Sequence, residues 1–313
     1  MFKFLKGLFG KPTTKFDIKA MVDEAIASGQ ISVRMLADSI SEHGQRITTF
    51  QLKYQRFFHA EFMTHRKFGR NASSSRAIPI MTILKQVWND PAMPMHWGVN
   101  QGGMQAKLEL TGVKRAMAKA AWKFAGRCAC IFAWMLMQLG VHKQVANRIL
   151  EPWQFIHVVV TSTDYENFSN LRNHDDAQPE IHILAYIIDG LLVNETPTLL
   201  LPGEWHLPYI THADTCNHDI ETLKKVSAAR CCRVSYMKHD GTESSVANDL
   251  RLCERLVGSE PLHASPFEHQ ATPDTFDART GMWKTPAMHA NLNGWNQHRK
   301  YIETEIWMNK HVL

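Results

Sequence analysis

The spacing of apolar residues predicts both helices and strands. Over 17–43, apolar side chains recur every three to four residues, which predicts a helix. Over 48–54 they alternate with polar ones, which predicts a half-buried strand, and the β-branched run 157–161 predicts a second strand. We therefore expect an α/β (α+β) fold, with a central mixed or antiparallel sheet and long surrounding helices.

The helix predicted over 114–139 is the clearest of all, because it is rich in Ala, Met and Trp. We expect its Met and aromatic stripe to be buried core. Its apolar run 128–139 is about a dozen residues, whereas a membrane helix needs about 20, so we expect no membrane span. Further expected elements are helices over 56–66, 165–192 (broken near Pro179) and 222–230, with loops at 71–75 and 193–219.

Three short pieces recur in the same order along the chain. They are Glu-His, Thr-Phe and His-Arg-Lys, first at 42–43, 49–50 and 65–67, then at 268–269, 275–276 and 298–300. The interval between the first two pieces is the same in both copies, which predicts a diverged duplicated unit. The predicted organisation is a nucleotide-binding unit over 1–195, a connector over 196–221 and a second unit over 222–313.

Composition narrows the function classes only slightly. Apolar residues make up 44% and charged residues 21%, as in soluble globular proteins. Lys plus Arg is 35 against 30 for Asp plus Glu, and this net charge of +5 suits an anionic small molecule better than nucleic acid. Six cysteines without a C-x-x-C pair predict free thiols and a cytoplasmic protein.

The densest polar segment is 64–76, which holds four cations and three serines. Arginine presents a planar fork that matches phosphate oxygens, and serine adds short donors. The segment is therefore either an anion pocket for a nucleotide phosphate or a solvated basic loop. Two other polar clusters lie at 167–181 and 263–269.

Together these segments resemble the flavin-dependent thymidylate synthases. That family's signature is Arg-His-Arg, seven residues, then Ser, and here His65-Arg66 precedes Ser74 by seven residues. The family's Leu-Arg-x4-Ala-Gln-x-Glu-Ile and His-x-Ser/Thr-Pro-Phe-Glu-His motifs resemble residues 171–181 and 263–269. Its Arg-Ile-x-Leu and Ala-Arg-Val-Ser motifs resemble residues 148–150 and 232–235.

The resemblance implies a role for each motif residue. Arg172 would lie against the uracil ring and polarise a carbonyl oxygen, and with Ser74 and His65 it forms the expected catalytic set. The nucleotide, including its phosphate, would be held by Arg172 and by Glu61, Ser73, Ser74, Ser75, Arg76 and Arg148. The flavin would contact His65, Arg66, Lys67, Asn71, Asn167, Ser235, His263, Ser265 and Glu268.

The resemblance also implies the reactants. FAD would carry the reducing equivalents, NADPH would supply them, and 5,10-methylenetetrahydrofolate would donate a one-carbon unit to C5 of dUMP. We expect a small pyrimidine deoxynucleotide as substrate, no metal, and no nucleic-acid or membrane partner. A homotetramer is implied, or a dimer if the second unit replaces a neighbouring subunit.

The chain departs from the family at several positions. Thr64 stands in place of the first signature Arg, Glu61 in place of a frequent Gln, and Ala77 in place of a frequent Tyr. Thr161 and Thr163 occupy positions where Asn and Arg commonly meet the flavin. The Ser-Pro-Phe-Glu-His motif follows the signature by about two hundred residues, whereas in the family it precedes it. We hypothesise that the first copy keeps the nucleotide site and the second supplies the flavin site.

Three alternatives remain open. A related hydroxymethylation at C5 would need the same site. The His-Asp pairs at 174–175, 218–219 and 239–240 suggest a metal-dependent phosphohydrolase, in which His and Asp surround a metal that activates water. A nucleic-acid-binding module would have to use the basic segment 64–76.

Overall fold

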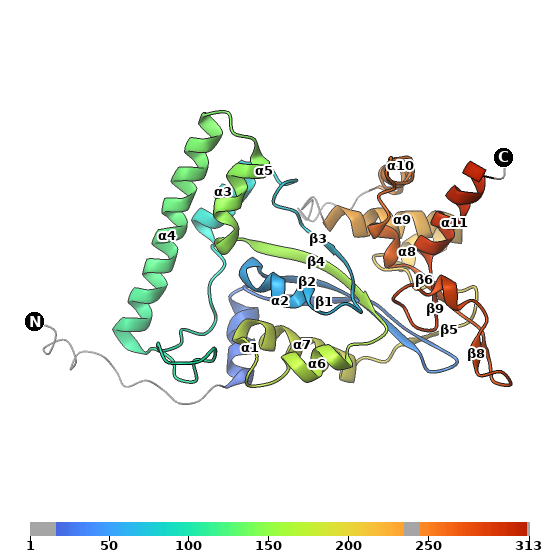
Figure 1. The fold of residues 1–313 in the computed structure, drawn as a ribbon, viewed down its shortest axis with the longest axis horizontal. Coiled ribbons are helices and arrows are strands. Elements are labelled where there is room, and N and C mark those ends of the chain that lie inside the picture. Colours follow the sequence, from blue (N-terminus) through green and yellow to red (C-terminus); the bar gives the residue numbers. More distant parts are fainter. Residues whose placement is uncertain (1–16, 235–244, 312–313) are drawn as a thin grey trace, which may run out of the picture.

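A five-stranded mixed sheet lies at the centre of the computed structural model, which describes residues 17–234 and 245–311 (Figure 1). The strands follow the order β3-β4-β2-β1-β5. Neighbours are antiparallel, except that β1 and β5 are parallel. This sheet and its long helices confirm the expected α/β class. The bounds are β1 Ser32–Ser41, β2 Arg46–Gln55, β3 Gly69–Ala72, β4 Phe155–Ser162 and β5 Thr198–Leu200.

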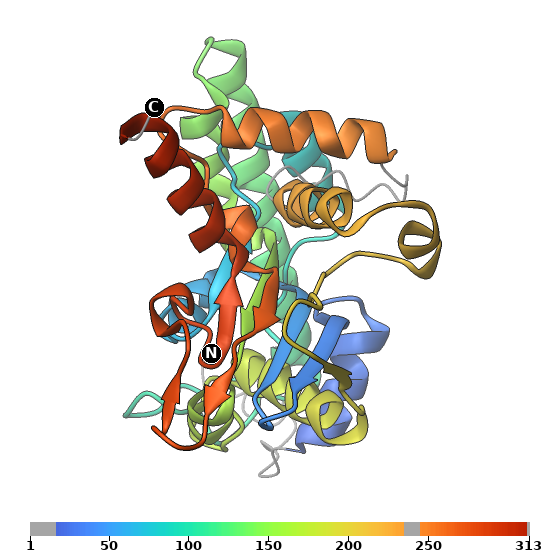
Figure 2. The same cartoon turned by 90° about the vertical axis from the view of Figure 1, so that its right-hand side faces the viewer.

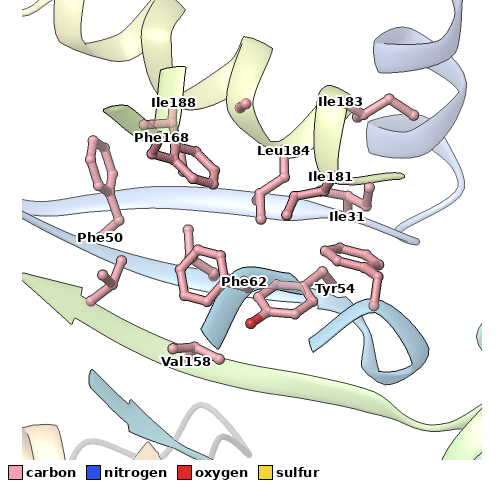
Figure 3. Close-up of a cluster of buried hydrophobic side chains, with 14 of the residues drawn as sticks. Ile31, Phe50, Tyr54, Phe62, Val158, Phe168, Ile181, Ile183, Leu184 and Ile188 are labelled. Carbon is pink, nitrogen blue, oxygen red and sulfur yellow. The ribbon is translucent and has the colours of Figure 1, made fainter. Parts of the chain in front are cut away.

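One face of the sheet is apolar and carries the main core. The predicted alternation in β2 is confirmed, since Phe50, Leu52 and Tyr54 all point to this face and are fully buried. Figure 3 shows Phe50 and Tyr54 in one cluster with the apolar side chains of α7. The elements that pack here are α1 Ile18–Ala27, η2 Arg56–Phe58, α2 His59–Met63, α6 Glu166–Arg172 and α7 Pro179–Asn194.

The C-terminal part of the chain covers the other face. In Figure 2 its helices and short strands lie toward the viewer, in front of the sheet. Cys231 and Val234 pack on Val159 of β4, and the carboxylate of Asp249 is buried between Arg230 and Arg233. The elements are α8 His212–Asn217, α9 Ile220–Arg233, α10 Val246–Val257, η5 Ser265–Glu268, β6 Ala271–Pro273, β7 Phe276–Asp277, β8 Met282–Trp283, η6 Pro286–Met288, β9 Trp295–Gln297 and α11 His298–His311.

A helical arm projects beside the sheet and is seen at the left of Figure 1. It consists of α3 Ile80–Asn89, α4 Gly112–Gln138, α5 Lys143–Ala146 and η3 Asn147–Trp153. Gly126 lets α4 approach η3 closely, because a Cβ at this position would lie 2.9 Å from Trp153 Cδ1. The arm therefore has its own small core, in which α4 contributes only its inner side.

The expectation for the arm is wrong in one respect. The helix predicted over 114–139 exists, but its Met and aromatic stripe is not buried core. Met117 is 62% exposed, Phe124 69% and Ile131 51%, whereas Gly126 and Ala133 on the inner side are buried. Composition identified the helix, but it could not tell which side the rest of the chain would cover.

The helix predicted over 17–43 is also wrong in its second half. The helix ends at Ala27, and Gly29 follows with φ +65°, a conformation that suits glycine beyond a helix end. Residues 32–41 form β1, which pairs with β2. A bulge between Met35 and Ala37 breaks the two-residue period, so Val33, Leu36 and Ile40 mimic helical spacing.

Most other predicted elements are confirmed, with small corrections. The helix predicted over 56–66 is two short pieces that end at Met63, and Asn71 and Ala72 belong to β3 instead of a loop. The connector contains β5 and α8. The proposed unit boundaries and repeat stay predictions. In the two copies, Thr49-Phe50 lies within the long strand β2, whereas Phe276 begins the two-residue strand β7.

Candidate functional site

The two motif-bearing regions meet at one cavity of about 370 Å³. Arg66, Phe68 and Gly69 line it from the signature segment. From the C-terminal region it is lined by Glu268, Ala290, Asn291, Gln297, Arg299 and Lys300. Residues that are about two hundred positions apart in the sequence therefore form one site.

Backbone contacts fix this junction. Gly69 pairs with Thr161 across β3 and β4, and a Cβ on Gly69 would lie 3.7 Å from the Cβ of Glu268. The Asn291 side-chain amide donates to the Lys67 carbonyl at 3.0 Å, and the Gln297 amide donates to the Glu268 carbonyl at 3.1 Å. The C-terminal region is thus held directly against the signature strand.

The cavity carries an excess of positive charge. Arg299 donates to Glu268 at 2.5 Å and to Glu303 at 2.6 Å. Burial raises the pKa of Glu268, and the Arg299 guanidinium opposes that shift. Arg66 is exposed and has no ion-pair partner within 17–234 and 245–311. A lining of this charge and size suits an anionic organic ligand.

His65 and Arg172 form a second polar group, at the end of α6. Arg172 Nε donates to His65 Nε2 at 3.0 Å, and Nη2 donates to the Thr64 hydroxyl at 3.2 Å. His65 packs between the rings of Phe68 and Phe168. Burial, then the charge of Arg172, lowers the pKa of His65 to about 4. His65 is therefore a neutral acceptor that orients Arg172, with its own proton on Nδ1.

Glu151 organises a third group, which the motifs did not indicate. It accepts from Ser75 Oγ at 2.7 Å and from Arg148 at 2.8 Å, and Arg56 lies 3.3 Å away. Arg56 also donates to the Ser73 carbonyl. The sequence patterns indicated Arg148 and Ser75 but not Arg56 and Glu151, which lie outside the polar clusters at 64–76, 167–181 and 263–269.

The serines and cations of segment 64–76 divide into structural and available groups. The Ser73 hydroxyl accepts from the His157 amide, and Arg70 donates to the carbonyls of Phe62, Met63 and His65. In contrast, Ser74 is half-buried and Arg76 exposed, and neither has a side-chain hydrogen bond within the described ranges. Ser74 and Arg76 are therefore free to meet a ligand.

The predicted flavin residues are not all in one place. Arg66 and Glu268 line the cavity described above, whereas exposed His263 lines another cavity of about 630 Å³ with Arg233 and Arg255. Lys67 lies 3.4 Å from Asp164. Asn167 is exposed on α6, and Ser265 begins η5. Ser235 lies outside the described residues.

Two predicted residues carry unsatisfied buried polar atoms. Asn71 is 5% exposed, and its Nδ2 has no hydrogen-bond partner among the described residues. It lies two positions after Gly69 in β3, so its side chain projects from the same face of the strand on which a Cβ at Gly69 would lie. Glu61 Oε2 is likewise buried without a partner there. An unpaired buried donor such as Asn71 Nδ2 is a group whose hydrogen bond a ligand could complete.

A chain of buried hydrogen bonds lies directly behind the cavity. His206 bonds to the hydroxyls of Ser39 at 2.9 Å and Thr49 at 2.8 Å. Thr49 bonds to Thr161 at 2.7 Å, and Thr161 bonds to His269 at 2.9 Å. Burial lowers the pKa of His206 and of His269 to about 3, so both rings are neutral. This series of hydrogen bonds links the sheet to His269, which is next to Glu268 in the sequence.

The sequence did not indicate this series of hydrogen bonds. Thr161 belongs to the predicted strand 157–161 and His269 to the motif at 263–269, and neither segment pointed to the other. Thr161 was considered for the flavin site, but its hydroxyl is directed to Thr49 and His269. His206 lies in the predicted connector and gave no local signal. The nearest available indication was the polar Thr161 directly after the apolar run 158–160.

Of the His-Asp pairs noted in the sequence, the pair at 239–240 lies outside the described residues. Within 17–234 and 245–311, no three His, Cys, Asp or Glu side chains gather as a metal site would require. No helix in those ranges has both the length and the hydropathy of a membrane span. All six cysteines are free thiols, as expected.

Comparisons with known proteins give limited similarity. No protein-family model matches the chain, and no curated protein matches it. Among solved structures, the UMP/dUMP methylase PolB from Streptomyces cacaoi, bound with 5-Br dUMP, is 15% identical. The match covers 52% of this chain and 90% of PolB, with a TM-score of 0.42. The same enzyme bound with 5-Br UMP gives 15% identity, coverage of 52% and 88%, and a TM-score of 0.41. Similarity of this extent assigns no function to the chain.

Proposed function

We propose that the chain is a flavin-dependent enzyme that modifies C5 of a pyrimidine nucleotide, with dUMP as substrate and methylenetetrahydrofolate as one-carbon donor. The observation that carries the proposal is the cavity shared by Arg66 and Gly69 with Glu268 and Arg299. Two motifs that resemble parts of one family's site are brought together by the fold, despite their distance in sequence.

The lining fits FAD in charge and in donors. Arg66, Arg299 and Lys300 supply positive charge for a pyrophosphate, and the unpaired Nδ2 of Asn71 supplies a buried donor. When bound, reduced flavin would supply the reducing equivalents for the new C5 substituent, with NADPH as their source. The protein's part is placement and charge.

Arg172 is the residue that we assign to the uracil ring. Its Nε donates a hydrogen bond to His65 and its Nη2 donates one to Thr64, and these two bonds fix the plane of the guanidinium. Its remaining donors can reach a carbonyl oxygen and stabilise negative charge that develops there. Thr64, which replaces an arginine of the family signature, contributes here by accepting a hydrogen bond from Arg172.

We assign the nucleotide phosphate to Ser74 and Arg76, because neither has a side-chain hydrogen bond among the described residues. Arg148, held by Glu151, lies 52% exposed and provides a further cation. Ser73 and Ser75 act by holding the loop instead, since their hydroxyls are already bonded.

The test is the absorbance spectrum of the purified protein, followed by mass analysis of the product. We expect a yellow protein that converts deoxyuridylate, with methylenetetrahydrofolate and NADPH, to a C5-methylated product. A hydroxymethylated product would support the related reaction instead. A colourless protein that cannot be reconstituted with FAD would refute the proposal.

A pair of variants tests the shared cavity itself. Ser265→Ala combined with Glu268→Ala should lower the flavin content, because it removes polar groups that the C-terminal region supplies. Glu254→Ala, at an exposed residue of α10 that lines neither of the two cavities, serves as the control. Flavin content at the wild-type level in the double variant would mean that the C-terminal region does not supply the flavin site.

A further inference from the structure

The outward side of α4 carries an unbroken apolar stripe. Gly126, Cys130 and Ala133 mark the buried inner side of this helix. On the opposite side lie Met117, Ala121, Phe124, Cys128, Ile131 and Met135, and all are exposed except the half-buried Cys128. Their spacing alternates between four and three residues, which is the spacing of the seam between paired helices. A helix that is apolar on both sides is normally covered on both sides.

The charges on α4 are distributed unevenly along its length. It carries five cations, at positions 114, 115, 119, 123 and 127, and no carboxylate. All five lie at or before position 127, and the last eleven residues, 128–138, are uncharged. Arg115 and Lys119 are directed inward, where both lie 3.7 Å from Glu24.

This distribution favours a second copy of α4 in antiparallel orientation. A parallel copy would place the cationic halves side by side, where like charges repel. An antiparallel copy places each cationic half beside an uncharged half and also opposes the two helix dipoles. The stripe is self-complementary in this arrangement, as an isologous two-fold interface requires.

The size of the surface is compatible with a stable pair. A 27-residue helix is about 40 Å long and about 10 Å wide, so the stripe alone presents roughly 400 Å² in projection. A standard interface needs about 800 Å² from each partner. Beside the stripe, an apolar cavity of about 520 Å³ between α3 and α4, lined by Met81, Trp88 and Trp134, extends the surface.

We propose that the outward face of α4 is the contact between two copies of this chain, with the two helices antiparallel about a two-fold axis. The axis crosses near residue 126, the middle of the stripe. Met117 of each copy then faces Met135 of the other. The proposal is independent of the catalytic function.

The first test is the mass of the full chain in solution by light scattering. We expect twice the chain mass of 35.8 kDa, or a multiple of that pair. Phe124→Glu combined with Ile131→Glu should halve the mass of the species. Val193→Glu, at a residue that is 83% exposed on α7, is the matched control and should leave the mass unchanged.

The second test fixes the orientation and does not depend on disrupting the pair. In a background of Cys128→Ser and Cys216→Ser, Met117→Cys combined with Met135→Cys should give an oxidised, cross-linked dimer. Either substitution alone should not, because residues 117 of the two copies would lie about 27 Å apart along the axis. Efficient cross-linking by Met117→Cys alone would overturn the antiparallel arrangement.

A monomeric wild-type chain would overturn the proposal, and two further measurements would then identify what covers the face. Co-sedimentation with vesicles of phosphatidylcholine and phosphatidylserine, lost in the double glutamate variant, would assign it to a lipid surface. Dimerisation that begins only after residues 1–16 are removed would assign it to the chain's own N-terminal segment.

Discussion

The two faces of the central sheet are built from the same strands but differ in what holds them together. On one face, Phe50 and Tyr54 of β2 and Val158 of β4 enter a continuous apolar cluster. On the other, Thr49 of β2 and Thr161 of β4 hydrogen-bond to buried histidines. Apolar packing is non-directional, whereas hydrogen bonds fix position and orientation. The apolar face therefore stabilises the fold, and the polar face positions the C-terminal motif against the signature strand.

The largest effect on stability should come from the apolar face. Phe50→Ala removes a fully buried ring and should lower the free energy of unfolding by about 3–5 kcal/mol. Denaturant unfolding measures this loss. The flavin content of the fraction that remains folded should not change, and a strong loss of flavin there would contradict the division between the two faces.

The largest effect on activity should come from Arg172, which lies at the edge of the apolar face. Arg172→Ala should lower turnover by about 10²–10³-fold, the range seen when a donor to developing charge is removed. Flavin should stay bound. Arg172→Lys should restore little of the lost turnover, because an ammonium group cannot donate to His65 and Thr64 in the geometry of a guanidinium. Arg279→Ala, on an exposed turn, is the control. Unchanged turnover in Arg172→Ala would reject the assigned role.

On the polar face, Thr161→Val should lower the free energy of unfolding by about 1–3 kcal/mol, because it leaves His269 Nδ1 without a buried partner and the Thr49 hydroxyl with His206 alone. Flavin affinity should fall as well, since His269 adjoins Glu268. Thr161→Ser keeps the hydroxyl and should retain most of both. If valine and serine behaved alike, the hydrogen-bond chain would not position the cavity.

The last prediction concerns the dependence of stability on pH. The pKa of His65 is lowered to about 4, and the pKa values of His206 and His269 to about 3, chiefly by burial. The unfolded chain takes up these protons near pH 6.5. Above about pH 6.5 the neutral histidines therefore do not lower the free energy of unfolding. As the pH falls toward 4 and then 3, protons bind preferentially to the unfolded chain and the free energy of unfolding decreases. In His206→Gln, the free energy of unfolding should change less between pH 7 and pH 4 than in the wild type. In Phe50→Ala, it should be lower by the same amount at every pH in that range.

The strands of the polar face were easier to predict than their hydrogen bonds. Alternation in 48–54 indicated which residues of β2 face the core, because one buried face imposes a period of two. It said nothing about His206, which comes from a connector about 150 residues later in the chain. The bulge in β1 produced a helical spacing within a strand, so a local pattern was outweighed by pairing with β2.

The candidate site shows the same division. The residue types of segment 64–76 indicated an anion site, but only the structure separated Ser74 and Arg76 from Ser73 and Arg70, whose side chains are already bonded. Arg56 and Glu151 could not be found from the sequence, because neither belongs to a local cluster. Their role depends on η2 and η3 lying side by side.

The sequence by itself determined the class of fold, most of the helices and strands, and the chemical character of the signature and of the Ser-Pro-Phe-Glu-His motif. These depend on residue type and on periodicity over short distances. The tertiary structure alone decided that the two motifs share a cavity, that neutral His65 orients Arg172, and that the apolar stripe of α4 faces outward. Those features depend on which distant segments pack together, and packing is set by the whole chain.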